Sequence, residues 1–146
     1  MTRDPNRLAE ADLRRLGATL ETEQREYRRL LRLAWRQNSY MRRQDVDRLE
    51  ANARDWARHL PAADAARIAR ERMVDELGRR AGIAIPPGRV GDLLDYAAPE
   101  AKAEVRGALK ELRKAAARLA RQNALNRTLA EFCLDLSHEE TEVFRR

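Results

Sequence analysis

The segment from residue 99 to residue 136 repeats a set of mostly apolar positions every seven residues, in two interleaved series. Two such series form one continuous seam along a helix, and a stable seam needs a neighbouring helix to cover it. The seam positions are Val105, Leu109, Leu112, Ala116, Leu119, Asn123, Asn126, Ala130 and Cys133. Pro99 and the carboxylate of Glu100 suit the first turn of this helix. A chain with this pattern is predicted to fold as long helices packed side by side.

An earlier stripe of apolar residues, spaced by three and four positions, predicts a first helix over residues 5–43. Asp4 and Pro5 are residue types that commonly begin helices. Glu23 places a charge in one position of the otherwise apolar stripe. The apolar members are Leu13, Leu16, Leu20, Tyr27, Leu30, Ala34 and Met41.

A second stripe, out of phase with the first, predicts another helix over residues 47–81 after a turn over residues 43–47. Its members are Val46, Leu49, Ala53, Trp56 and Leu60. Asp47 and Glu50 have the spacing of a capping box, and Pro61 is expected to kink or split the helix. No glycine or proline lies at the turn, so one continuous helix is the alternative.

Gly82 and the prolines that follow it end the second helix, and residues 90–96 are predicted to form a short connector helix. Each long helix would extend over about 50–60 Å, so three of them can pack side by side. The predicted fold class is all-α: an elongated antiparallel three-helix bundle, coiled-coil-like, with a short connector helix before the last helix. One helical bundle domain is predicted over residues 1–137, and a short polar C-terminal tail over residues 138–146.

The 146 residues include 30 Lys and Arg against 24 Asp and Glu, a net charge of +6 that raises nucleic acid or an anionic membrane as partners. Acidic and basic side chains are mixed along the chain, which weakens both ideas. Arginine-rich stretches at residues 28–43 and 113–127 would form a nucleic-acid patch only if they shared one face. A solvated surface is the commoner meaning of such runs, so nucleic acid is an unlikely partner.

Several classes of protein lack their characteristic residues in this sequence. No apolar run approaches the about 20 residues that span a bilayer, the N-terminus is charged, and Cys133 is the single cysteine. His59 and His138 have no His or Cys near them at metal-ligand spacing, and no glycine-rich phosphate loop is present. The sequence therefore predicts a cytoplasmic protein with no membrane span, no catalytic residues, no cofactor and no metal.

Beyond residue 124 the last predicted helix has a second apolar stripe, which consists of Leu125, Leu129, Phe132 and Leu136. The first three each precede a seam position by one residue, a rotation of about 100° around the helix. Covering such side chains is worth about 1.5–3 kcal/mol each, so a cover is expected. It would come from the other helices or the connector, from a helix of a partner protein, or from a second copy of the chain in a homodimer.

Five segments resemble, in the same order, the pattern of the FlgN-type flagellar export chaperone family. They are Glu26–Leu33, Asp45–Leu49, Glu71–Leu77, Leu119–Leu129 and Phe132–Leu136. The most specific is the run Asn123-x-x-Asn126-x-x-Leu129 with the apolar residues after it. The resemblance implies a cytoplasmic type III export chaperone that binds the C-terminal helical segments of hook–filament junction proteins. It implies that these segments are kept from premature assembly and delivered to the flagellar export apparatus.

The resemblance also implies that cargo contacts the C-terminal helix region, which coincides with the second stripe. The predicted partner-binding residues are Asn123, Leu125, Asn126, Leu129, Phe132 and Leu136. The leucines and the phenylalanine would make the apolar contact, and the two asparagines would set its geometry. A basic helical nucleic-acid-binding module and a self-associating structural bundle are the alternative functions.

Overall fold

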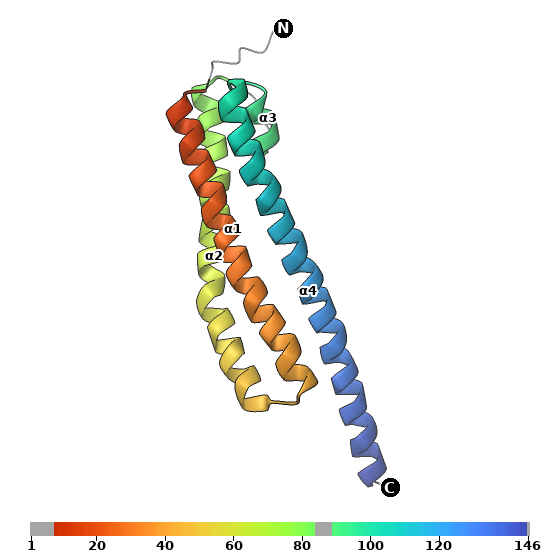
Figure 1. Ribbon diagram of the computed structural model, residues 1–146. Coiled ribbons are helices and arrows are strands. Elements are labelled where there is room, and N and C mark those ends of the chain that lie inside the picture. The colour runs from red at the N-terminus through yellow and green to blue at the C-terminus, as the bar shows by residue number, and fades with distance from the viewer. Residues whose placement is uncertain (1–7, 84–88, 146) are drawn as a thin grey trace.

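The computed structural model describes residues 8–83 and 89–145, and every secondary-structure element in these ranges is a helix. The helices are α1 (Glu10–Arg42), α2 (Val46–Arg80), α3 (Val90–Leu94) and α4 (Pro99–Arg145). Three of them are long, and α3 is a single short helix between α2 and α4 (Figure 1). The predicted all-α class is confirmed. None of the helices in the described ranges has an apolar stretch that would reach across a bilayer.

α1 is the central helix of the three long ones. It packs along α2, which runs in the opposite direction, and along α4, which runs in the same direction (Figure 1). Within the described residues, no Cα of α2 lies within 8 Å of a Cα of α4. α3 contacts both of these helices at the end where α4 begins, and the other end of α4 extends past the α1–α2 turn (Figure 1). The side of the molecule between α2 and α4 is therefore not closed by direct packing of the two helices.

The apolar core is large at the α3 end and small toward the α1–α2 turn. At the α3 end all four helices contribute to one cluster of buried side chains: Leu8, Leu13, Leu16, Leu20, Val74, Leu77, Val90, Leu93, Leu94, Ala97, Val105, Leu109 and Leu112. Farther along, a second cluster contains only Leu30, Leu33 and Ala63, with the partly buried Trp56 and Leu119 packed against it. Because burial of apolar surface is the main favourable term in folding, the α3 end provides most of the stabilisation.

The stripe predicted for the first helix faces the core. Six of its seven apolar members are buried, and Tyr27 is partly buried. Glu23, the charge within the stripe, is also buried, with 1% of its surface exposed. The stripe is therefore confirmed. Asp4 and Pro5 lie outside the described residues, but the helix predicted from residue 5 begins only at Glu10, because Ala9 before it is extended.

The turn between α1 and α2 forms without glycine or proline. Gln44 adopts the left-handed conformation, with φ 54°. Asp45 caps α2, because its Oδ1 accepts a hydrogen bond of 3.2 Å from the backbone N–H of Arg48. The turn predicted over residues 43–47 is confirmed. The capping box predicted to begin at Asp47 is wrong, since the carboxylate two residues earlier provides the cap.

The stripe predicted for the second helix is wrong in part. Val46 is 61% exposed, Leu60 is 39% exposed, and Ala53 is also on the surface. α2 turns a different face toward α1, and the buried residues of that face include Asn52, Ala63, Ala66, Val74 and Leu77. The predicted stripe lies on the flank that only α4 would cover, and α4 is too distant to do so. The helix also continues through Pro61, so the split predicted there does not occur.

The seam predicted for the last helix packs against α1 over most of its length. Val105, Leu109, Leu112 and Asn126 are buried, and the other members up to Ala130 are partly buried. Cys133 is exposed, so its predicted place in the core is wrong. Ala130, three residues earlier, already lies beside Met41 near the end of α1, so no α1 residue is left to cover Cys133. α4 also continues to Arg145 instead of ending near Leu136. No glycine or proline follows Gly107 to stop it.

Candidate partner-binding site

Asn126 fixes the position of α4 against α1. Its side chain is 3% exposed and uses its whole hydrogen-bonding capacity. The amide nitrogen donates to the carbonyl oxygen of Ala34 (2.8 Å) and to Oε1 of Gln37 (3.2 Å). The amide oxygen accepts from Nδ2 of Asn38 (3.0 Å) and from Nε2 of Gln122 (3.0 Å). Three of these hydrogen bonds cross from α4 to α1, and sliding α4 by one turn would break them, so the network sets the register of the two helices.

Two residues of the second apolar stripe of α4 are exposed. Leu125 is 54% exposed and Phe132 is 59% exposed, whereas Leu129 is partly buried. The side chain of Leu136 lies outside the described part of the structure. Leu134, which the sequence interpretation did not include, is 61% exposed. The sequence feature that could have indicated its exposure is the nearly continuous apolar run that begins at Phe132. Such a run covers more of the helix circumference than one packed face requires.

The predicted asparagines do not lie on the open surface as the apolar residues do. Asn126 is buried between α1 and α4, and Asn123 is partly buried. Neither position contributes to the exposed apolar stripe. Among the predicted residues whose side chains the structure describes, Leu125 and Phe132 are thus exposed, whereas Asn126 is buried and positions the helix.

Exposed apolar residues of α4 lie on two flanks of its contact with α1. Each residue of an α-helix is rotated by about 100° around the helix axis from the residue before it. Measured from the direction of Asn126, Leu125 and Phe132 are rotated by about 100–120° to one side. Ala130 and Leu134 lie about 40–80° to the other side, which is the side of α2. The sequence prediction covered only the first flank.

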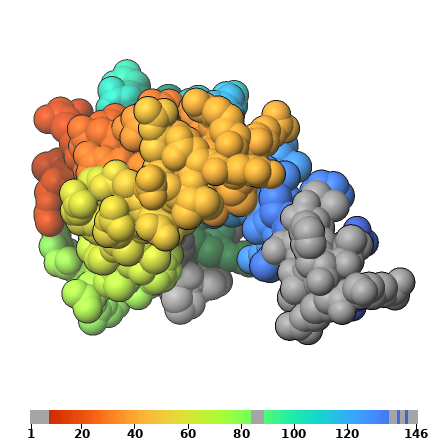
Figure 2. Space-filling model, turned by 90° about the horizontal axis from the view of Figure 1, so that it is seen from below, coloured from red at the N-terminus to blue at the C-terminus, as the bar shows by residue number. Residues whose placement is uncertain are grey.

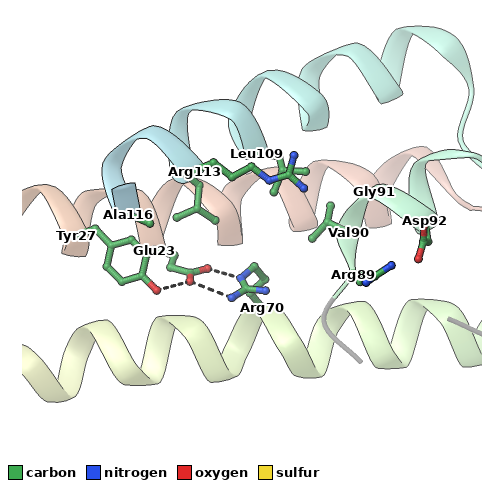
Figure 3. A pocket seen from close by; sticks show the side chains of 11 residues that line it. Glu23, Tyr27, Arg70, Arg89, Val90, Gly91, Asp92, Leu109, Arg113 and Ala116 are labelled. Atoms are coloured by element: carbon green, nitrogen blue, oxygen red, sulfur yellow. Dashed lines mark hydrogen bonds and ion pairs between the residues drawn. The ribbon is translucent and has the colours of Figure 1, made fainter. Parts of the chain in front are cut away.

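A second group of polar residues joins α1 to α2. Oε2 of the buried Glu23 is 2.6 Å from Nε of Arg70, and its Oε1 is 3.3 Å from Nη2 of the same arginine (Figure 3). The hydroxyl of Tyr27 donates a hydrogen bond of 2.7 Å to Oε1 of Glu23. Burial, followed by this hydrogen bond and the charge of Glu23, raises the pKa of Tyr27. The three side chains satisfy one another, and they form the floor of a hollow of about 580 Å³.

A comparison with known protein families identifies the family of this chain. Residues 12–146 match the model of the FlgN family, described as FlgN protein, and this range contains α2, α3 and α4 together with nearly all of α1. No curated protein and no solved structure matches the chain. The family match covers most of the sequence and agrees with the resemblance of its helical segments. The chain belongs to the FlgN protein family, and its general role is that of a flagellar export chaperone.

Proposed function

We propose that this FlgN-family protein is a cytoplasmic chaperone for hook–filament junction proteins. It binds their C-terminal helical segments, prevents these segments from assembling early, and delivers them to the flagellar export apparatus. Its three long helices form an elongated bundle that holds the binding helix, α4, in a defined register. The proposed contact residues are Leu125, Leu129, Phe132 and Leu136, with Asn123 and Asn126 setting the geometry.

The observation that supports this proposal is the exposure of Leu125 and Phe132 on α4. Side chains of this size are worth about 1.5–3 kcal/mol each when an apolar surface covers them. An amphipathic helix of the cargo provides such a surface. An export substrate arrives unfolded, and ordering its segment offsets part of the gross interaction energy. A moderate affinity is expected, as release at the export apparatus requires.

The replacement Phe132→Asp tests the proposal. The aspartate should weaken binding of a hook–filament junction segment by about tenfold or more, equivalent to about 1.4 kcal/mol, in isothermal titration calorimetry. Because Phe132 is 59% exposed, helicity and the midpoint of urea unfolding should stay close to those of the unmodified protein. A matched control is Ala124→Asp, which places the same charge on an exposed part of α4 about 160° from the Asn126 direction.

Two results would contradict the proposal. Unfolding of the protein by Phe132→Asp would mean that the stripe is part of the core. Equal binding by the Phe132→Asp variant and the unmodified protein would mean that cargo, if bound, contacts another surface.

A further inference from the structure

The side of the molecule between α2 and α4 forms a groove with α1 as its floor, and we call it the α2–α4 groove. It contains two hollows. The turn-end hollow, of about 420 Å³, is lined by Gln37, Met41, Leu49, Asn52, Ala53, Trp56 and Ala130. The α3-end hollow, of about 580 Å³, lies between α2 and α4 with α1 behind it (Figure 3). Viewed from the turn end, α2 (yellow and green) and the coloured part of α4 (blue) lie on the left and right of the molecule, with α1 (orange) above α2 (Figure 2).

Both walls of the groove have apolar side chains that no other helix covers. On α2, Val46 and Leu60 are 61% and 39% exposed. They lie on the same flank as Trp56, about 40–120° from Asn52, which faces α1. On α4, Leu134 is 61% exposed and lies on the flank of Ala130, which lines the turn-end hollow. Two apolar flanks that face each other across a gap are the geometry that receives a further helix.

The α3 end of the groove has an excess of basic side chains. Arg89 and Arg113 line the α3-end hollow beside the apolar side chain of Leu109 (Figure 3). Asp92 also lines it, so two arginines stand against one carboxylate there once the Glu23–Arg70 ion pair is set aside. Both arginines are exposed, and neither forms an ion pair with another described residue. In contrast, the turn-end hollow contains no charged residue. A helix with apolar residues along one face and carboxylates toward one end would complement both parts.

We propose that the α2–α4 groove binds an acidic amphipathic helix of the cargo, with its carboxylates paired to Arg89 and Arg113. The α1 residues of the two hollows, Tyr27 and Met41, are separated by about 21 Å along the helix, so about four helical turns reach from one hollow to the other. This inference rests on the proposed function, because it assigns a second docking surface and a chemical character to the same class of partner. It adds α2 and α3 to a contact that otherwise involves only α4.

The experiment compares two groups of variants in calorimetric titrations with the C-terminal segment of a hook–filament junction protein. Ala53→Lys places a charge in the apolar part of the groove, and Ala51→Lys on the opposite flank of α2 is its matched control. The pair Arg89→Glu and Arg113→Glu reverses the basic end, and Arg106→Glu with Arg121→Glu is the matched control on α4. All six positions are exposed, so circular dichroism should show unchanged helicity.

A charge-neutral copy of the segment, with Asp and Glu replaced by Asn and Gln, identifies the role of the carboxylates. We expect Ala53→Lys and the Arg89/Arg113 reversal each to weaken binding of the natural segment by about tenfold at low ionic strength, and the controls to have little effect. The neutral segment should bind the unmodified protein more weakly and should be insensitive to the Arg89/Arg113 reversal. That pattern is the signature of a direct charge pair.

Three outcomes would be contrary, and they are distinguishable. Loss of binding in Phe132→Asp but full binding in both groove variants would overturn the groove and leave the proposed function intact. Absence of binding by the unmodified protein would overturn both. A dimer of the unmodified protein in light scattering that Ala53→Lys dissociates would place a second copy of the chain in the groove, and would overturn the assignment of a cargo helix there.

Discussion

Replacing Arg70 with Met should destabilise the protein strongly, because it leaves a buried carboxylate without its cation. Glu23 is 1% exposed, and Arg70 contacts both of its oxygens, at 2.6 and 3.3 Å. The hydroxyl of Tyr27 is the other hydrogen-bond donor to this carboxylate among the contacts of the described residues. Methionine keeps an unbranched apolar side chain at the position and removes only the guanidinium. The change therefore removes the positive charge, together with the hydrogen bonds of the guanidinium, at little cost in side-chain volume.

The size of the effect follows from the exposure of the two partners. Removing one partner of a buried ion pair costs about 3–5 kcal/mol. The lower end applies here, because the Arg70 side chain keeps 18% of its surface exposed and the hollow beside it is open to water. The hydrogen bond from Tyr27 also remains. We therefore expect the free energy of unfolding to fall by about 3 kcal/mol.

The assay is urea unfolding followed by circular dichroism, on the unmodified protein, Arg70→Met, Glu23→Gln and the double variant. Adding Glu23→Gln to Arg70→Met should restore about 1–2 kcal/mol, because no charge is then buried. The double variant should thus be more stable than Arg70→Met alone. A double variant that is less stable than Arg70→Met, with the two losses simply adding, would refute the reasoning. It would mean that the carboxylate does not depend on Arg70.

Three further changes have definite expected outcomes. Burial and the Glu23 hydrogen bond raise the pKa of Tyr27, so its stabilising effect is complete below about pH 10 and declines as the pH rises above that value. Tyr27→Phe should therefore make the alkaline loss of stability shallower in unfolding experiments across that range. Asn126→Ala should lower the free energy of unfolding by about 1–3 kcal/mol, because the buried carbonyl oxygen of Ala34 and the partly buried side chains around Asn126 lose their hydrogen bonds. Gln44→Gly should raise it by about 0.5–1 kcal/mol, since glycine adopts the left-handed conformation without strain, whereas Arg43→Gly, at φ −88°, should lower it.

The sequence was sufficient to predict the features that depend on local pattern and on close packing of the neighbouring helices. The stripe of α1 is buried as predicted because α1 packs against both other long helices, so all of its apolar face is used. The change of phase between residues 41 and 46 correctly indicated a turn, although no glycine or proline is present there. Even the charge at Glu23 was visible as an exception within the stripe, but its partner was not.

The parts that could not be predicted depend on distances between helices. Periodicity identifies which residues of α2 are apolar, but it does not reveal whether a third helix approaches them. Val46 and Leu60 are exposed for this reason alone, and Asn52, which donates a hydrogen bond of 2.9 Å to the carbonyl oxygen of Leu33, takes the buried position instead. The predicted burial of Cys133 was wrong for the same reason, because the seam of α4 continues after α1 ends. The contact of the α4 stripe with cargo stays a prediction.

The polar layer at Asn126 has a consequence for the surfaces that follow it. A leucine at this position would pack against α1 at several registers, whereas the saturated network around Asn126 permits one. A single register keeps Leu125 and Phe132 on the flank away from α2 and Leu134 on the flank toward it. In the proposed function, each flank alone offers a limited apolar area, which favours release. A cargo segment that contacts both flanks of α4 is bound more tightly than a segment that contacts one flank. Displacement of the cargo from either flank would therefore lower its overall affinity.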